Sequence, residues 1–201
     1  MSDPLRTVEA LIARGTGPAL GALDRPDLDY AGLAAQIDHV AGQLAGLGLG
    51  PGDNVAIVLP NGPEMASAFM AVASCAIAAP LNPAYTEDEF AFYMDDLGAK
   101  ALIVMQGVDT PARAAAARHA IRLLEAAADA NEPAGRFTLT EGGAALPVAE
   151  PTRNAPDDVA LVLHTSGTTS RPKIVPLTAR NVTASASAIA GSLALSDADR
   201  C

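Results

Sequence analysis

Short, almost continuously apolar segments alternate with longer helical patterns along this chain, and this alternation limits the fold more than any other feature. Apolar runs of strand length are typical of parallel strands that helices cover on both faces. The runs comprise residues 53–60, 76–83, 100–105 and 159–166. Strands that alternate with helices predict an α/β fold, with a mainly parallel sheet and helices on both faces.

The segments between these runs carry helix patterns and caps. Leu33, Ile37, Val40 and Leu44 share one face of a helix. The segment 86–98 opens with a capping box formed by its Thr and Glu and ends at a Gly. Further helices are expected after Pro63 and after Thr178, together with a short one over residues 4–15 and a long Ala-rich one over residues 109–131. The remaining expected elements are a hairpin that turns at residues 24–27, a short strand at residues 136–140 and a loop over residues 141–158.

The composition excludes several classes of protein. The 201 residues are 50% hydrophobic, which is enough for a sizeable core. The net charge of -10 argues against nucleic-acid partners and against attraction to anionic membranes. The one segment that could pass for a membrane span, residues 65–81, is short and ends in Pro80 and Leu81, so we interpret it as a buried helix that leads into a buried strand. We expect no nucleic-acid and no membrane partner, and we leave a homodimer open.

The cysteines and histidines indicate no metal centre. Cys75 and Cys201 are the two cysteines, which favours a reducing, cytoplasmic setting, and a packed, inert thiol is the expectation for Cys75. The three histidines lack ligand spacing. The glycines of residues 47–54 follow a helix and precede a strand, so they predict a helix stop and a tight turn rather than a dinucleotide fingerprint.

A polar segment, HTSGTTSRPK, interrupts the apolar strands near the end of the chain. It joins a buried strand to a second strand and combines hydroxyl side chains with Gly167 and with Lys173, one of two lysines in the chain. Small residues, several donors and one cation suit an oxyanion, although the alternative of a plain hairpin turn stays open. The spacing of a Walker A loop is absent. The candidate phosphate-binding residues are Thr165, Ser166, Gly167, Thr168, Thr169, Ser170 and Lys173.

This polar segment resembles the signature loop of the adenylate-forming (AMP-binding) enzymes, which include acyl-CoA synthetases, peptide-synthetase adenylation domains and luciferases. The sequence upstream of this segment is also similar to the N-terminal region of that family. The similarity covers most of residues 30–181, including GPGDNVAIVLPN and APLNPAYTEDE. The motif LHTSGTTSRPK is most similar to that of the branch that includes oxalate–CoA ligases. The resemblance implies the N-terminal subdomain of such an enzyme.

The resemblance also implies a two-step reaction that uses ATP, Mg²⁺ and CoA. A carboxylate attacks the α-phosphate of ATP to give an acyl-adenylate and pyrophosphate, and CoA then displaces AMP. In this family the matching loop, residues 165–169 with Lys173, holds the β- and γ-phosphates while pyrophosphate leaves. Its physical task is to stabilise charge on the leaving group, a task shared with Mg²⁺. No residue of this chain matches a family residue that acts directly in the chemistry, and none is expected to ligate a metal.

Two residues depart from the family pattern. Ile174 stands where the family usually has Gly, and if that position requires a positive φ the backbone there is expected to be strained. Cys75 also replaces a usual Gly, which concerns helix packing rather than chemistry.

We interpret residues 1–201 as the N-terminal portion of an AMP-binding ligase domain, without the adenine pocket, the hinge and the C-terminal domain. The leading hypothesis is an ATP-dependent acid–CoA ligase acting on a small carboxylic acid, with this portion alone inactive. Two alternatives stay open. One is an adenylation domain that loads a carrier protein, and the other is a non-catalytic module that serves in binding or assembly.

Overall fold

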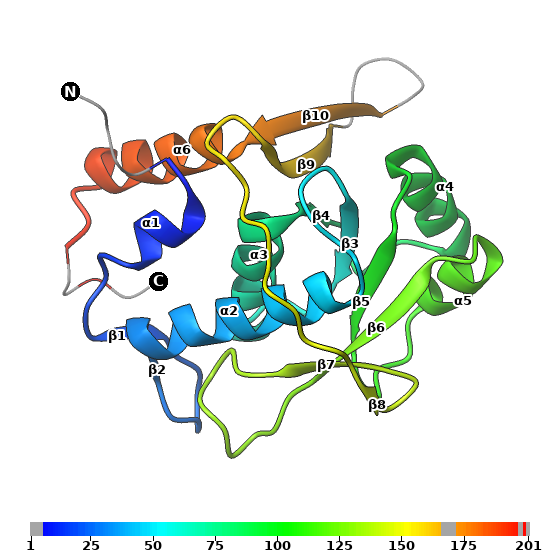
Figure 1. Ribbon diagram of the computed structural model, residues 1–201, viewed down its shortest axis with the longest axis horizontal. Helices are drawn as coiled ribbons and strands as arrows, with labels where there is room; N and C mark the ends of the chain where they lie inside the picture. Colours follow the sequence, from blue (N-terminus) through cyan, green and yellow to red (C-terminus); the bar gives the residue numbers. More distant parts are fainter. Residues whose placement is uncertain (1–5, 166–171, 197–198, 200–201) are drawn as a thin grey trace.

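A computed structural model describes residues 6–165, 172–196 and 199 of the chain. Within that part an eight-stranded sheet runs through the molecule in the order β10-β9-β4-β3-β5-β6-β7-β8 (Figure 1). Its strands are β3 (Asn54–Val58), β4 (Ile77–Pro80), β5 (Ala101–Met105), β6 (Arg122–Ala127), β7 (Thr138–Glu141), β8 (Ala144–Ala145), β9 (Val159–Thr165) and β10 (Lys173–Thr178).

The centre of the sheet is parallel and its borders are antiparallel. The five central strands, in the order β9-β4-β3-β5-β6, run parallel to one another. At the borders, β10 pairs antiparallel with β9, and β7 pairs antiparallel with β6 and β8. The α/β class with a mainly parallel sheet is therefore confirmed. A separate small hairpin of β1 (Pro18–Leu20) and β2 (Leu28–Asp29) precedes the sheet, and Asp24 adopts a φ of 59° between these strands, in the predicted turn.

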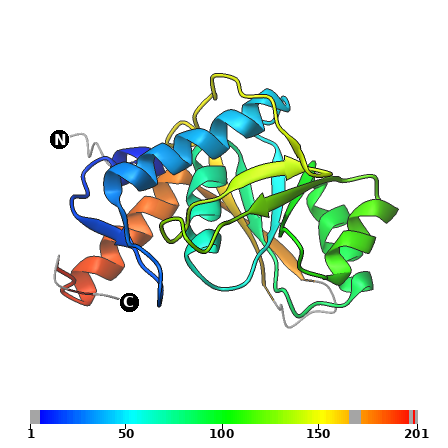
Figure 2. The ribbon, with the colours of Figure 1, turned by 90° about the horizontal axis from the view of Figure 1, so that it is seen from below.

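Helices cover both faces of the sheet (Figures 1 and 2). One face carries α1 (Val8–Ile12), α2 (Tyr30–Gly46) and α3 (Pro63–Cys75), with the first residue of α6 (Ala179–Ser192) in the same core. The other face carries α4 (Glu87–Leu97) and α5 (Pro111–Arg118). No helix in the described ranges is long and apolar enough to cross a membrane.

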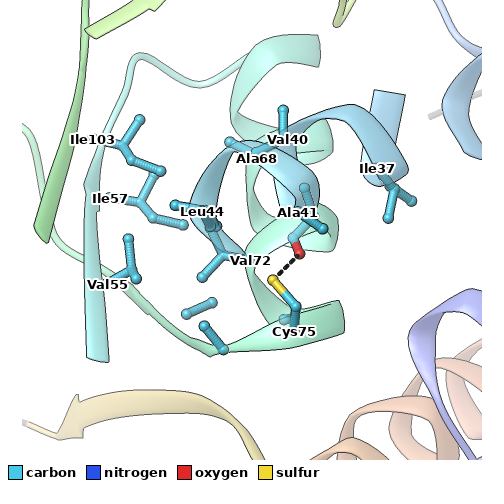
Figure 3. Close-up of a cluster of buried hydrophobic side chains, with 14 of the residues drawn as sticks. Ile37, Val40, Ala41, Leu44, Val55, Ile57, Ala68, Val72, Cys75 and Ile103 are labelled. Carbon is cyan, nitrogen blue, oxygen red and sulfur yellow. Dashed lines mark hydrogen bonds between the residues drawn. The ribbon is translucent and has the colours of Figure 1, made fainter. Parts of the chain in front are cut away.

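The larger core lies between α2, α3 and the central strands (Figure 3). Val40, Leu44 and Val72 are fully buried, as are Val55 and Ile57 of β3. The predicted face of α2 is thus the buried one. Burial of a Val, Leu or Ile side chain stabilises a fold by about 1.5–3 kcal/mol, so this contact is a main source of the stability of the domain.

The predicted helix ends are confirmed where short-range chemistry fixes them. Thr86 and Glu89 form the capping box of α4, and Gly98 ends that helix in the left-handed conformation. Thr178 caps α6, and the side chain of Asn181 in turn accepts from the Thr178 backbone. The turn after α2 is also confirmed, because Gly48 has a positive φ of 78°.

The prediction of one long helix over residues 109–131 is wrong. Helix α5 ends at Arg118, Ala120 turns the chain with a φ of 52°, and the following residues form β6 parallel to β5. Leu124 and Ala126 are buried on this strand. Pairing with β5 and burial at every second residue therefore override the high helix propensity of this Ala-rich segment. The expected helix over residues 4–15 is also shorter and spans Val8–Ile12.

Candidate phosphate-binding hairpin

The predicted polar loop lies between two antiparallel strands. Lys173, the first residue of β10, pairs with Thr165, the last residue of β9. Directly opposed residues of an antiparallel pair project from the same face, so a hydroxyl and an ammonium group lie side by side. Both residues are exposed. The other predicted site residues, Ser166, Gly167, Thr168, Thr169 and Ser170, lie outside the described residues.

The hairpin leaves the sheet at the edge where ligands bind in open α/β folds. Strand β9 runs parallel to β4, which is itself parallel to β3. The carboxyl ends of these strands therefore point in one direction, and Thr165 is at the carboxyl end of β9. Crevices outside the carboxyl ends of parallel strands are the usual ligand sites of such sheets.

Lys173 is available for an anionic ligand as far as the structure describes the chain. It forms no ion pair with any residue of the described ranges, although acidic side chains outnumber basic ones by 23 to 13 in the sequence. An ammonium group beside a hydroxyl donor fits a phosphate. Within the described ranges no three His, Cys, Asp or Glu side chains gather as metal ligands.

The condition under which backbone strain was expected at Ile174, a positive φ, is not met. Ile174 lies within β10 opposite His164, and positive φ values of non-glycine residues in the described part are confined to Asp24, Ala120 and Ala194. Its side chain is 42% exposed. A β-branched residue suits this extended edge strand, so the departure from Gly distorts no described backbone.

A cluster of ring side chains beside the hairpin was missed by the sequence analysis, which gave His164 no role. The side chain of His164 is 7% exposed, and its Nε2 lies 3.2 Å from Oδ2 of Asp96 on α4. Its ring meets that of Tyr93 at a centroid distance of 4.7 Å, and Tyr93 stacks on Tyr85 at 4.8 Å. Burial, together with the neighbouring Tyr93, raises the pKa of Tyr85. The signal for this cluster was the single polar ring in an apolar strand.

Cys75 is a packed thiol, as predicted. It is buried at the end of α3, with Sγ 3.5 Å from the carbonyl oxygen of Ala71 (Figure 3). Burial raises the pKa of Cys75 to about 11, because the thiolate would lose its hydration. A thiol with that pKa is a poor nucleophile at neutral pH.

Two cavities lie away from the hairpin. One, of about 420 Å³, lies between α2 and residues 127–138 and has polar walls that include Gln36, His39 and Arg136. The other, of about 440 Å³, lies between α1, the start of α2 and α6. Neither is lined by Thr165 or Lys173, so neither belongs to the candidate phosphate site.

The fold of the chain matches those of solved structures over about two fifths of their length. It superposes on a long-chain-fatty-acid–CoA ligase of Archaeoglobus fulgidus with a TM-score of 0.74 at 21% identity, covering 98% of this chain and 41% of that one. It superposes on apo MatB of Rhodopseudomonas palustris with a TM-score of 0.72 at 23% identity, covering 95% of this chain and 38% of that one. At these levels of identity the superpositions show a shared fold.

The family whose profile matches residues 13–201 is described as AMP-binding enzyme, and the chain belongs to that family, that of the adenylate-forming enzymes. A probable CoA ligase of Humulus lupulus is 42% identical over 176 residues, which are 86% of this chain and 33% of the relative. The oxalate–CoA ligase of Arabidopsis thaliana is 38% identical over 188 residues, which are 90% of this chain and 36% of the relative. The chain thus spans about a third of the length of these relatives.

Proposed function

We propose that the chain is the N-terminal portion of an ATP-dependent acid–CoA ligase, which activates a small carboxylic acid as an acyl-adenylate and transfers the acyl group to CoA. The observation that carries the proposal is the pairing of Thr165 with Lys173 at the carboxyl edge of the sheet, on either side of the sequence SGTTSRP. The named relatives are CoA ligases, which favours CoA over a carrier protein as the acceptor.

The role of the hairpin in this function is to bind phosphate oxygens. The Thr165 hydroxyl donates a hydrogen bond, and the Lys173 ammonium supplies a positive charge. Charge that develops on the leaving pyrophosphate is stabilised by donors that are already in place, since no reorganisation is then required during the reaction. Residues 166–170 are proposed to contribute further hydroxyl and backbone donors to the same phosphates, and Arg171 lies in the same stretch.

Mg²⁺ is proposed to bind chiefly through the phosphates of ATP. This ion commonly keeps several waters and takes only one or two protein carboxylates beside substrate phosphates. When bound, it supplies charge neutralisation on the phosphate oxygens. The hairpin itself offers hydrogen-bond donors and a cation, so we propose that it binds the phosphate oxygens rather than the Mg²⁺ ion.

The remaining parts of the proposal concern the rest of the protein. Residues 1–201 correspond to a portion that carries the phosphate hairpin, while the adenine pocket and the closing domain are proposed to lie in further sequence. A reducing, cytoplasmic setting is supported by the free, buried thiol of Cys75. A homodimer stays open, and the alternatives of carrier-protein loading and of a non-catalytic module are outcomes of the test below.

The experiment is a chimera in which residues 1–201 replace the aligned segment of the Arabidopsis oxalate–CoA ligase. We expect oxalate-dependent pyrophosphate release followed by formation of an acyl-CoA. Lys173→Ala should lower this activity more than tenfold, since a charge-assisted contact to the leaving group is lost. Lys100→Ala is the matched control, because Lys100 is the other lysine, is exposed and precedes β5.

Each other result of the chimera has a defined meaning. Acyl-adenylate without transfer to CoA would favour the carrier-protein alternative. A folded chimera without pyrophosphate release would favour the non-catalytic module. Equal activity of the Lys173→Ala and Lys100→Ala variants would contradict the phosphate role of the hairpin.

A further inference from the structure

The hairpin extends beyond the sheet that supports it. Pairing of β9 with β4 is confined to Leu161 opposite Ala78, whereas β9 and β10 pair up to Thr165 and Lys173. The end that carries Thr165 and Lys173 is therefore a two-stranded ribbon, and an isolated two-stranded ribbon is only marginally stable in water. Side-chain contacts must hold this end in one position if it is to keep a fixed geometry.

His164 makes the contact that meets this requirement. It adjoins Thr165 in sequence and pairs with Ile174, which adjoins Lys173. Its Nε2–H donates to Oδ2 of Asp96, 3.2 Å away, and its ring packs edge to face on Tyr93. An imidazole–carboxylate bond is charge-assisted and therefore stronger than a neutral one.

The partner of His164 is itself fixed. Asp96 and Tyr93 lie on α4, whose Phe90 and Met94 are fully buried in the second core. Tyr93 is held from its other side by the stacked ring of Tyr85, in the segment between β4 and α4. The side chain of His164 thus connects the ribbon to a helix that is anchored in the second core, although the Asp96 side chain itself is 39% exposed.

We propose that His164, bonded to Asp96 and packed on Tyr93, is a positioning residue that holds the end of the β9–β10 hairpin against α4 and so fixes the relative placement of Thr165 and Lys173. The side chain of His164 projects from the face of the hairpin opposite to those of its neighbour Thr165 and of Lys173, because successive residues of a strand alternate. It therefore acts through the backbone and does not touch the phosphate. The consequence for ligand binding rests on the proposed function, whereas the tether itself does not.

The test measures amide hydrogen exchange by NMR in the 201-residue chain. In His164→Leu, the amides of residues 163–165 and 173–175 should exchange about tenfold faster, as expected for loss of one hydrogen bond to a charged group. Amides of β3 and β5 should be unchanged. His164→Gln should restore slow exchange, because its amide nitrogen can replace Nε2 as the donor to Asp96.

A second pair of variants removes the bond from the helix side. Asp96→Ala should produce the same local acceleration, and Asp95→Ala, which removes the neighbouring acid, should not. The carboxylate of Asp95 lies 3.8 Å from His119 and serves as a matched control. Unchanged exchange in both His164→Leu and Asp96→Ala, or exchange in His164→Gln as fast as in His164→Leu, would overturn the tether.

Binding of inorganic pyrophosphate, followed by ³¹P NMR, separates this inference from the proposed function. Binding that weakens in His164→Leu and recovers in His164→Gln supports the positioning role. Equal binding in all three proteins, with faster exchange in His164→Leu, would overturn that role and leave the proposed function intact. If the unaltered chain binds no pyrophosphate, the phosphate role proposed for the hairpin fails, and the exchange measurement alone decides the tether.

Discussion

At the scale of single residues, burial decides which polar groups are chemically available. Cys75 and Lys173 are opposite cases, since the first is enclosed at the end of α3 and the second is exposed at the end of a hairpin. The buried thiol keeps its proton at neutral pH. The exposed ammonium forms no ion pair with the part of the chain that the structure describes. Residue type alone would have made both of them candidates for chemistry.

The Cys75 thiol gives stability a defined pH dependence. Its pKa is about 11 in the folded chain against 9.0 for an ordinary thiol. Above pH 9 the unfolded chain loses the proton while the folded chain keeps it, so stability falls as the pH rises from 9 towards 11. Between pH 8 and pH 10 this loss should be on the order of 1 kcal/mol.

The measurement is urea unfolding of the unaltered chain and of Cys75→Ala at both pH values. Every ionisable group other than Cys75 is common to both proteins, so the difference between the two pH dependences isolates Cys75. Parallel loss of stability in the two proteins would contradict a thiol pKa of about 11.

At the scale of elements, α6 depends on its first turn more than the other long helices do. Only Ala179 and Thr183 of its residues are buried. The capping box of Thr178 and Asn181 satisfies backbone donors that packing does not protect. Helix α2, in contrast, is held by the large apolar core.

Thr178→Ala should therefore lower the free energy of unfolding by about 1 kcal/mol and speed amide exchange within α6. Thr178→Ser keeps the capping oxygen and should stay close to the unaltered chain. Denaturant unfolding, combined with exchange of the α6 amides, provides the measurement. An equal loss of stability in the Ser and Ala variants would mean that the methyl group of Thr178, rather than its hydroxyl, is what matters.

Elements were predictable from the sequence where local chemistry or continuous burial determined them. The box of Thr86 and Glu89 and the apolar run of β3 are local signals, and both are confirmed. Strand β6 was not predictable in the same way, because the Ala-rich sequence around it favours a helix. Only pairing with β5 makes it a strand. The contact of His164 with Asp96 joins residues 68 positions apart, which no local pattern records.

At the scale of the whole molecule, two observations support the proposal that the hairpin binds phosphate. These are the parallel sheet and the membership of the AMP-binding family. The chain spans about a third of the length of its relatives. In our account the affinity of the complete protein for ATP comes from several elements that act together, and this chain holds one of them. We therefore expect weak binding of phosphates and no acid-dependent pyrophosphate release by the chain alone.

The most direct test of the phosphate role is a ³¹P NMR titration of inorganic pyrophosphate with the 201-residue chain, Lys173→Ala and Lys100→Ala. We expect weak, saturable binding that decreases with added salt, since exposed charges are screened. Lys173→Ala should weaken it up to about fivefold, the effect expected of one exposed charge contact, and Lys100→Ala should leave it unchanged. No saturable binding, or equal binding by the unaltered chain and Lys173→Ala, would mean that the hairpin is not a phosphate site.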